Sequence, residues 1–183
     1  SQRFIEFFSF IKMKRFQLQC LLACLFFSMS LSSFGQKKIG QSVWMTTNLN
    51  VAKFRNGDPI PQARTVDQWK LANENQKPAW CYYNYDHVNG TKYGKLYNWY
   101  AVNDARGLAP EGWHVPSDEE WTNLTDCLGG ASVAGGKMKE VGTTRWKSPN
   151  TEATNSSGFS GLPGGFRAAG WFSDIRNIGF WWS

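Results

Sequence analysis

The sequence predicts an aromatic-cored, loop-rich α+β domain with two main helices and early strands. Three observations support this class. Ten Trp, 13 Phe and 18 Gly among 183 residues indicate an aromatic core with many turns. One strongly capped helix is readable at residues 118–128, and the last third of the chain is rich in Gly, Ser, Thr and Asn. The length beyond an N-terminal leader is sufficient for one domain.

The charge distribution gives no sign of a nucleic-acid partner. The whole chain has a formal net charge of +6. Four of its 20 basic residues and one of its 14 acidic residues lie within residues 1–35, which leaves a net charge of +3 for the remainder. These remaining charges are scattered rather than gathered in basic runs, so we expect no nucleic-acid interface.

Residues 13–35 have the features of a secretory signal peptide. Lys14-Arg15 forms a basic start, an apolar stretch follows, and small residues lead to a predicted cleavage between Gly35 and Gln36. Residues 1–12 precede Met13 and are interpreted as non-native upstream translation. The predicted domain therefore covers residues 36–183, in an exported protein of the cell envelope or exterior.

Two alternatives for the leader remain open. A membrane anchor is disfavoured because Gln17, Gln19 and several serines interrupt an apolar stretch that is short for a span of about 20 residues. We therefore expect no transmembrane span in the mature chain. Residues 21–24 (Leu-Leu-Ala-Cys) resemble a bacterial lipobox, which would place a lipid on Cys24. The apolar run continues beyond Cys24, however, and this favours later cleavage.

The body of the chain opens with strand, turn and helix signals. Residues 42–47 combine β-branched and aromatic side chains, which predicts the first strand. Residues 56–59 (Asn-Gly-Asp-Pro) predict a turn. Thr65 and Gln68 have the spacing of a capping box, so we expect a short helix that ends before Pro78.

Two further elements are expected before residue 107. Residues 80–85 are mainly aromatic and predict a strand that closes at an Asn89-Gly90 turn. Residues 93–106 place several side chains on one helical face, which predicts a second main helix ended by Gly107. This face consists of Leu96, Trp99, Tyr100 and Asn103.

Residues 118–128 have the clearest helix pattern in the chain. Ser117 is placed to cap the first turn, and Glu120 completes a capping box. Acidic side chains occupy the positive end of the helix dipole, and two glycines follow the last turn. The apolar stripe of this helix consists of Trp121, Leu124 and Leu128.

The aromatic residues divide into two groups. Four tryptophans at core-facing spacings are expected to pack inside the fold: Trp44, Trp99, Trp113 and Trp121. After Gly130, irregular sequence indicates functional loops between short strands. Exposed aromatic, arginine and amide side chains in such loops often anchor partners. The candidate ligand contacts are Trp146, Asn150, Arg167, Trp171 and Arg176. Packing is the competing interpretation for most of them, because large aromatics are buried on average.

Several motifs then occur in a fixed order along the chain. They lie at residues 39–45, 48–50, 93–102, 112–121, 148–151, 157–160, 162–167 and 180–183. Together they resemble the Fibrobacter succinogenes major paralogous domain, a family of secreted and envelope domains in Bacteroidetes-type bacteria. The resemblance extends from about residue 39 to residue 183.

This resemblance implies a C-type-lectin-like fold, in the branch that also contains formylglycine-generating-enzyme-like modules. Two helices would flank a small antiparallel sheet, and long loops would form a binding face. In the family, further strands follow the Trp-Trp-Ser motif and close the sheet. The chain is therefore interpreted as truncated at Ser183. We expect the strand at residues 43–47 to present an open edge and the fragment to be poorly soluble.

No motif for metal or cofactor chemistry is readable. A zinc site needs about three or four grouped ligands, whereas His87 and His114 stand apart in the sequence. His114 is expected as a packed core or turn residue. The glycines do not follow the strand-to-helix pattern of a phosphate loop. The Glu-Pro-Asn, Gln-Pro-Asp and Trp-Asn-Asp triplets of calcium-dependent lectins are also absent from the sequence. We therefore expect neither a metal nor a cofactor.

Cys81 and Cys127 are the two cysteines beyond the leader. Export permits a disulfide between them, but only geometry decides the pairing. Cys127 lies beside the apolar stripe of its helix and is also interpretable as a buried free thiol. Family members often carry a cysteine near their C-terminus. The resemblance therefore implies a further alternative, in which Cys81 has lost such a partner.

The sequence thus favours a secreted or cell-surface binding module, non-enzymatic, that contacts a glycan or protein through loops between about residues 146 and 176. The first alternative is a structural domain of an envelope or adhesive assembly with no small ligand. The second is a degenerate formylglycine-generating-type enzyme. Those relatives use a cysteine pair late in the domain, where neither Cys81 nor Cys127 lies.

Overall fold

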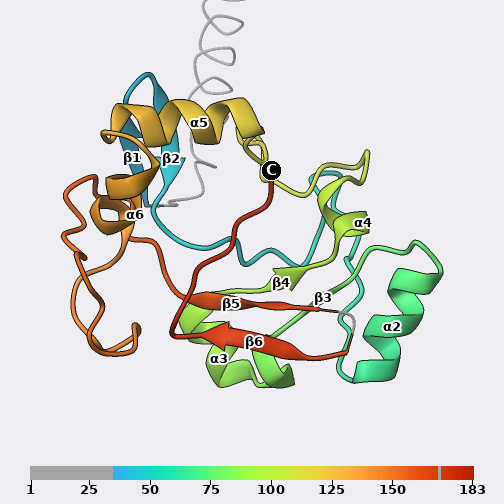
Figure 1. Ribbon diagram of the computed structural model, residues 1–183. Coiled ribbons are helices and arrows are strands. Elements are labelled where there is room, and N and C mark those ends of the chain that lie inside the picture. The colour runs from blue at the N-terminus through green and yellow to red at the C-terminus, as the bar shows by residue number, and fades with distance from the viewer. Residues whose placement is uncertain (1–34, 169) are drawn as a thin grey trace, which may run out of the picture. The chain divides into compact units, whose positions relative to one another are not determined.

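The computed structural model describes residues 35–168 and 170–183 (Figure 1). The described chain combines short helices with antiparallel strand pairs, which confirms the α+β class. The predicted upstream segment, the signal peptide up to Phe34 and the lipobox at Cys24 lie outside the described residues. Within the described part, no helix is both long and apolar enough to cross a bilayer.

The helices and strands are short and alternate along the chain. The helices are α2 (Val66–Glu74), α3 (His87–Tyr93), α4 (Trp99–Val102), α5 (Asp118–Cys127) and α6 (Ala131–Met138), with a 3₁₀ turn η1 (Tyr83–Tyr85). The strands form three antiparallel pairs: β1 (Gln36–Ile39) with β2 (Ser42–Met45), β3 (Trp80–Cys81) with β4 (Leu96–Tyr97), and β5 (Gly164–Arg167) with β6 (Phe172–Ile175).

The first predicted strand is present as β2, and it pairs with β1 in a hairpin that the sequence analysis did not predict. The register places Lys37 opposite Trp44 and Ile39 opposite Ser42. Gly40 forms the turn with a φ of +60°, a conformation that favours glycine. Ile39 and Trp44 are buried and attach the hairpin to the core beneath α5.

Helix α5 confirms its prediction in both bounds and chemistry. The Ser117 hydroxyl accepts from the Glu120 amide at 3.2 Å, and the Glu120 carboxylate accepts from the Ser117 amide at 2.9 Å. Leu124 and Leu128 are buried, and Trp121 packs half-buried against the same cluster. The cap and the apolar stripe therefore fix where α5 begins and which face it buries.

Helix α2 begins and ends where the sequence predicted, but its cap differs in one bond. The Thr65 hydroxyl accepts from the Gln68 amide at 3.2 Å, as expected. The Gln68 side chain instead accepts from the Arg64 amide at 2.7 Å, so the reciprocal half of the capping box is displaced by one residue. Trp69 is buried and joins α2 to a cluster with Ala63, Ala79 and Cys81.

The predicted strand at residues 80–85 is shorter than expected, and the predicted Asn89-Gly90 turn is wrong. Asn84 and Tyr85 take left-handed backbone angles and coil the chain into η1. Residues 89–90 lie within α3, which the Asp86 carboxylate caps by accepting from the Val88 amide at 2.8 Å. Gly90 is required inside this helix, because a Cβ there would meet the Tyr82 ring at 2.1 Å.

The predicted helix at residues 93–106 is also wrong. Gly94 has a φ of +81° and ends α3, and the next residues form β4 against β3. The buried Asn98 side chain then caps α4, accepting from the Ala101 amide at 3.0 Å and from the Ala79 amide at 2.9 Å. Leu96, which was assigned to the helical face, lies in β4 opposite Cys81, and the Asn98 cap delays the helix to Trp99. Trp99 itself is 46% exposed rather than packed in the core.

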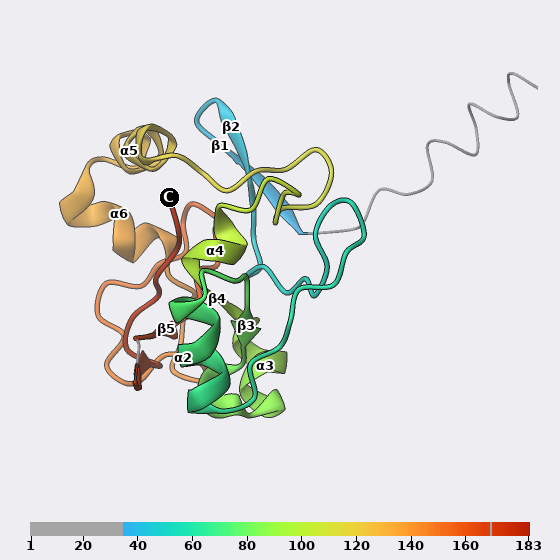
Figure 2. The same ribbon diagram turned by 90° about the vertical axis from the view of Figure 1, so that its right-hand side faces the viewer.

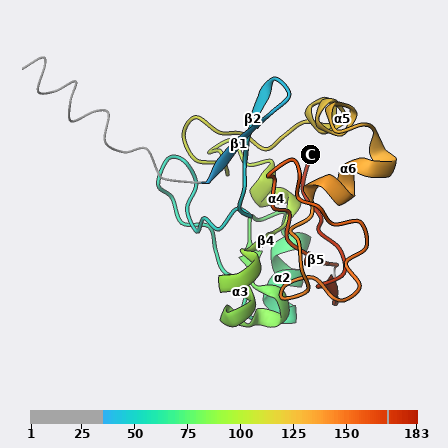
Figure 3. The same ribbon diagram turned by 90° about the vertical axis from the view of Figure 1, so that its left-hand side faces the viewer.

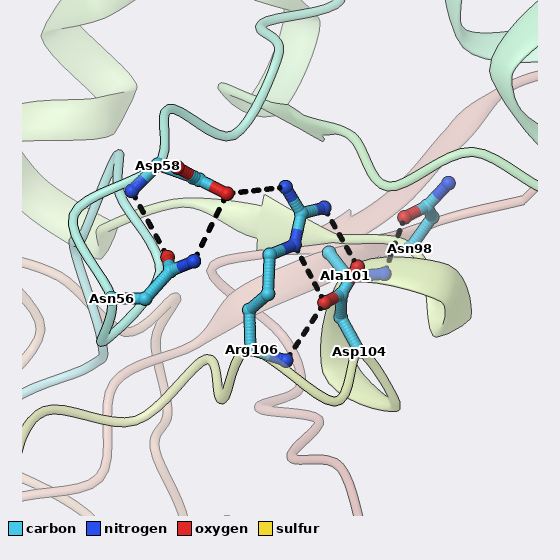
Figure 4. Close-up of polar contacts among 6 residues, drawn as sticks. All are labelled: Asn56, Asp58, Asn98, Ala101, Asp104 and Arg106. Carbon is cyan, nitrogen blue, oxygen red and sulfur yellow. Dashed lines mark hydrogen bonds and ion pairs between the residues drawn. The ribbon is translucent and has the colours of Figure 1, made fainter.

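Arg106 ties the loop after α4 to the early turn that the sequence predicted at residues 56–59. Its Nε donates to Asp104 at 2.8 Å and its Nη1 donates to Asp58 at 3.1 Å (Figure 4). The Asn56 amide donates to Asp58 as well, at 3.0 Å. Hydrogen bonds from these donors hold the pKa values of Asp58 and Asp104 below their ordinary range. These charged groups bond to one another, so the cluster holds the loop after α4 against the turn at residues 56–59.

Helix α6 was not expected, because the sequence after Gly130 is rich in glycine. It has no side-chain cap, and Gly135 and Gly136 lie in its interior. Ala134 and Met138 are buried in the same cluster as Leu124 of α5. Packing against α5 therefore stabilises a helix that its own composition disfavours.

The C-terminal segment after β6 crosses the fold between elements that are far apart in sequence (Figures 1 and 2). The Trp182 indole donates to the Tyr97 carbonyl of β4 at 3.1 Å. The Trp121 indole of α5 donates to the Trp182 carbonyl, also at 3.1 Å. Trp181 packs against Phe159 with ring centroids 5.7 Å apart. This segment therefore connects α5 with β4.

Candidate functional site

A cleft of about 390 Å³ lies beside α6 and is the candidate functional site. Its lining residues come mainly from α6, from the chain that follows α6 and from the segment after β6. Figure 3 shows the ribbons of α6 and of the C-terminal segment. Its volume falls within the range of about 300–1,000 Å³ that is typical of small-molecule sites. The lining residues are Ala131, Ser132, Gly135, Gly136, Met138, Lys139, Trp146, Glu152, Gly161, Asn177, Ile178, Gly179 and Trp181.

Glycines allow the cleft walls to approach closely. A Cβ on Gly136 would meet the Glu152 carbonyl oxygen at 2.6 Å, so this glycine lets the 147–158 loop lie against α6. A Cβ on Gly179 would meet the Trp181 ring at 2.4 Å. Gly135 differs, because its Cβ would meet nothing within 4 Å. The cleft is therefore closely packed around Gly136 and Gly179 and open at Gly135.

Two indoles and one ammonium group give the cleft its recognition chemistry. The Trp146 indole N–H donates to the Gly161 carbonyl at 3.1 Å, which fixes the ring. Lys139 Nζ lies 5.3 Å from the Trp146 ring centroid and donates to the Thr151 carbonyl at 2.6 Å. Trp181 is 40% exposed at the other wall, and its indole donates to Asn48 at 3.3 Å. Fixed aromatic surfaces of this kind stack on apolar faces of ligands.

Polar groups stand at the rim of the cleft. Glu152 and Asn177 are exposed. Glu152 also has a left-handed φ of 61°, which is uncommon for a non-glycine residue. Glu152 is one of the residues that orient the loop over α6. Around the two indoles, the carboxylate can accept hydrogen bonds, the ammonium can donate them, and the amide can do both. The arrangement is suited to binding a polar ligand with apolar faces.

The structure places the five predicted ligand contacts in two regions. Trp146 lines the cleft, but it is buried and does not project from a loop. The Asn150 Nδ2 donates to the carbonyls of Glu140 and Gly142, at 2.9 and 2.8 Å. Arg176 is exposed beside the cleft residue Asn177, and its Nη2 donates to the Thr143 carbonyl at 3.2 Å. Asn150 and Arg176 thus hold the loops that surround the cleft.

The other two predicted contacts lie at the far end of the β5–β6 hairpin. Arg167 pairs in register with Phe172, whereas the cleft begins beyond Ile175, which pairs with Gly164 at the opposite end (Figure 1). Trp171 is 62% exposed in the connection between the two strands. The predicted set therefore does not form one site.

The possible Cys81–Cys127 disulfide is not formed, and both cysteines are free thiols. Cys81 is buried in the cluster around Trp69, whereas Cys127 lies on α5 beside the β1–β2 turn. Burial raises the pKa of the Cys81 thiol to about 12. The interpretation of Cys127 as a buried thiol is wrong, because its side chain is exposed.

The two histidines do not assemble a metal centre. His114 is exposed rather than packed, and its Nε2 contacts the Glu120 carboxylate at 2.8 Å. His87 is the first residue of α3 and contacts Asp86. Across residues 35–168 and 170–183, no group of three or more His, Cys, Asp or Glu side chains is placed to hold a metal ion.

Comparison with protein families identifies the domain. The profile of the Fibrobacter succinogenes major domain matches residues 38–183. The chain belongs to this family. The Fibrobacter succinogenes major domain therefore includes the second half of β1, the α6 cleft and the C-terminal segment. No match was found among curated proteins or among solved structures.

Several cleft residues of this Fibrobacter succinogenes major domain were not predicted as site residues: Lys139, Glu152, Asn177 and Trp181. Trp181 belongs to a motif that supported the family resemblance, and its large aromatic side chain was the available signal. Lys139 and Glu152 carry no local signal, because only the packing of α6 against the following loop brings them together.

Proposed function

We propose that this protein is a secreted or cell-surface binding module, non-enzymatic and of C-type-lectin-like fold, that holds a glycan in the α6 cleft. The observation that carries the proposal is the Trp181 indole, which is 40% exposed on a cleft of about 390 Å³ that the buried Trp146 also lines. Pyranose rings present apolar C–H faces to indoles, and their hydroxyls bond to carboxylate, amide and ammonium groups.

The family and the arrangement of elements support the lectin-like part of the proposal. Helices flank small antiparallel strand pairs, and long loops surround the cleft. Binding would be independent of the calcium geometry of true C-type lectins, whose sequence triplets the chain lacks. Neither Cys81 nor Cys127 lies at the late position of the cysteine pair in formylglycine-generating-type enzymes, and this supports a binding role over that alternative.

The experiment that tests this proposal is a glycan array on the full chain, followed by calorimetric titration of the best glycan. Gly135→Leu is the sharpest variant, because its side chain would enter open space in the cleft from a helical position. Leucine also has a higher helix propensity than glycine, so the variant is expected to fold. Gly135→Leu fills space in the cleft, and Trp181→Ala removes a stacking surface. We expect each variant to weaken glycan binding at least about tenfold.

Two exposed tryptophans outside the cleft serve as controls. Trp99→Ala removes a 46% exposed indole on α4 and should leave glycan affinity unchanged. Trp171→Ala tests the loop contact predicted from sequence, and it should also bind as the original chain does. Loss of binding in Trp171→Ala with normal binding in Gly135→Leu would move the site away from the cleft. Uniform silence on the array would instead favour a structural domain of an envelope or adhesive assembly.

A further inference from the structure

Arg167 at the end of β5 is enclosed by three aromatic rings. The guanidinium carbon lies 4.4 Å from the Phe172 ring centroid and 5.8 Å from those of Trp69 and Tyr85. Its Nη2 donates to the Tyr85 hydroxyl at 3.0 Å. Its Nε and Nη1 are buried and contact no hydrogen-bond acceptor among the described residues. Most of its donor capacity is thus unused within this part of the chain.

The charge of this guanidinium is also unbalanced. No Asp or Glu in residues 35–168 and 170–183 forms an ion pair with Arg167. Asp67 of α2 is near enough to raise the pKa of Tyr85 but forms no ion pair with Arg167, and burial raises the pKa of both the Cys81 thiol and the Tyr85 phenol. They remain neutral near pH 7, so neither supplies a negative charge. A buried charge without a partner is unfavourable, and arginine keeps its charge in proteins.

The backbone holds Tyr85 in a conformation that needs support from its surroundings. Tyr85 has a φ of 57° and follows Asn84, which has a φ of 53°. Left-handed geometry is a clear outlier for a bulky aromatic residue and often marks functional sites. Here it directs the phenol toward both Arg167 and Phe172, whose ring lies 5.1 Å from that of Tyr85. The strained turn thereby completes the aromatic enclosure.

We propose that Arg167 binds one oxyanion, the carboxylate or sulfate group of an acidic ligand, with the Tyr85 hydroxyl as a second contact. A guanidinium fork matches such groups by forming two parallel hydrogen bonds. The residue as a whole is only half-buried, so rotation about its side-chain bonds brings the unused donors to the surface. Leaving the present position costs the hydrogen bond to Tyr85 and the contacts with the three rings, and the paired hydrogen bonds to the oxyanion replace them.

This oxyanion site is separate from the α6 cleft. The two lie at opposite ends of the β5–β6 hairpin, with Arg167 beside α2 and η1 (Figure 1). Trp171, which is 62% exposed, follows in the connection between the strands and offers an aromatic surface close to the site. An acidic saccharide has the required chemistry of one oxyanion beside an apolar ring face.

The experiment measures thermal unfolding of the full chain during titration with sodium sulfate and with sodium glucuronate, against sodium chloride at equal ionic strength and against glucose. We expect a saturable rise of the melting temperature with at least one of the two oxyanions. Arg167→Met should weaken that apparent affinity about tenfold to a hundredfold, because it removes charged hydrogen bonds. Arg176→Met removes another loop arginine and is the matched control, with an unchanged response.

Arg167→Lys keeps a positive charge and removes the fork, which secures the test if Arg167→Met does not fold. Its melting-temperature response should be weaker than that of the original chain. In the NMR spectrum of the original chain one arginine Nε–H resonance should shift with the oxyanion, and this resonance should be missing from the spectrum of Arg167→Lys. Equal responses in Arg167→Lys and Arg176→Met, or a response without saturation, would overturn the proposal. Trp181→Ala should leave the oxyanion response intact, so failure of the cleft proposal and failure of this one are distinguishable. Sulfate and glucuronate responses separate the two oxyanion classes.

Discussion

Helices α5 and α6 are adjacent in the chain and pack together, yet different forces determine them. In α5 the start, the acidic first turn and the buried stripe are all encoded by neighbouring residues. In α6 there is no side-chain cap, and two glycines occupy the interior. Helix α6 depends on contacts with α5 and with the 147–158 loop, and these contacts also build the cleft. The proposed binding surface therefore lies on the helix that is less stable by itself.

The largest expected effect comes from Gly136→Ala, which tests whether the loop contact holds α6. The added Cβ would lie 2.6 Å from the Glu152 carbonyl oxygen, and this backbone atom cannot move aside without shifting the loop. We expect a loss of about 1–3 kcal/mol in the free energy of unfolding, as for other overpacked sites. Urea denaturation followed by tryptophan fluorescence measures it.

The neighbouring substitution Gly135→Ala is the matched control for this prediction. It lies in the same helix, and its Cβ would enter open space. Alanine favours the helical conformation, so we expect a gain of about 0.5–1 kcal/mol. If both substitutions stabilise the protein to the same extent, the loop does not press against α6 as the structure shows.

Ser117→Ala tests the opposite proposition, that α5 is fixed by its own cap. The substitution removes the hydroxyl that accepts from the Glu120 amide. Loss of such a cap costs about 1 kcal/mol in the free energy of unfolding. Ser132→Ala on α6 is the control, and because α6 has no side-chain cap we expect no measurable change from it. A cap variant as stable as the original chain would show that tertiary packing alone holds α5.

The same contrast explains which parts of the fold were predictable from sequence. The bounds of α5 and α2 were predicted because Ser117 and Thr65 act on residues only three positions away. The helix at residues 93–106 was wrongly predicted because Asn98 bonds to Ala79, 19 residues earlier. The periodicity argument considered only the apolar spacing from Leu96 onward and not the bond that the Asn98 side chain makes to a distant backbone amide. Distant partners of this kind leave no local pattern.

Prediction of the candidate site was limited for the same reason. Trp146 was predicted as a contact, and it does line the cleft. Its partners, Lys139 of the chain after α6 and Trp181 near the C-terminus, are brought to it only by the packing of α6 and by the path of the C-terminal segment. Composition indicated that the last third of the chain holds the functional loops. It did not indicate that an unpredicted helix forms one wall.

The smallest expected effect concerns the pH dependence of the α5 cap. The bond from the Ser117 amide, and then the contact with His114, lower the pKa of the Glu120 carboxyl below its ordinary value of 4.5. Below that value the unfolded chain binds more protons at this position than the folded chain. The contribution of Glu120 to stability is therefore complete above about pH 4.5 and is lost as the pH falls through the lower folded pKa.

Glu120→Gln isolates this contribution, because glutamine keeps an acceptor for the Ser117 amide but has no charge. We expect the original chain to be more stable than the variant at pH 7, by less than the effect of Ser117→Ala, and the difference to disappear toward pH 3. His114→Ala removes one partner of the carboxylate, so the contribution should be smaller and its loss should be complete at a higher pH. Urea denaturation between pH 3 and pH 7 measures all three chains. Parallel stability curves for the original chain and Glu120→Gln would mean that the charge of Glu120 adds nothing to the cap, and that the local encoding of α5 rests on its neutral hydrogen bonds and apolar stripe.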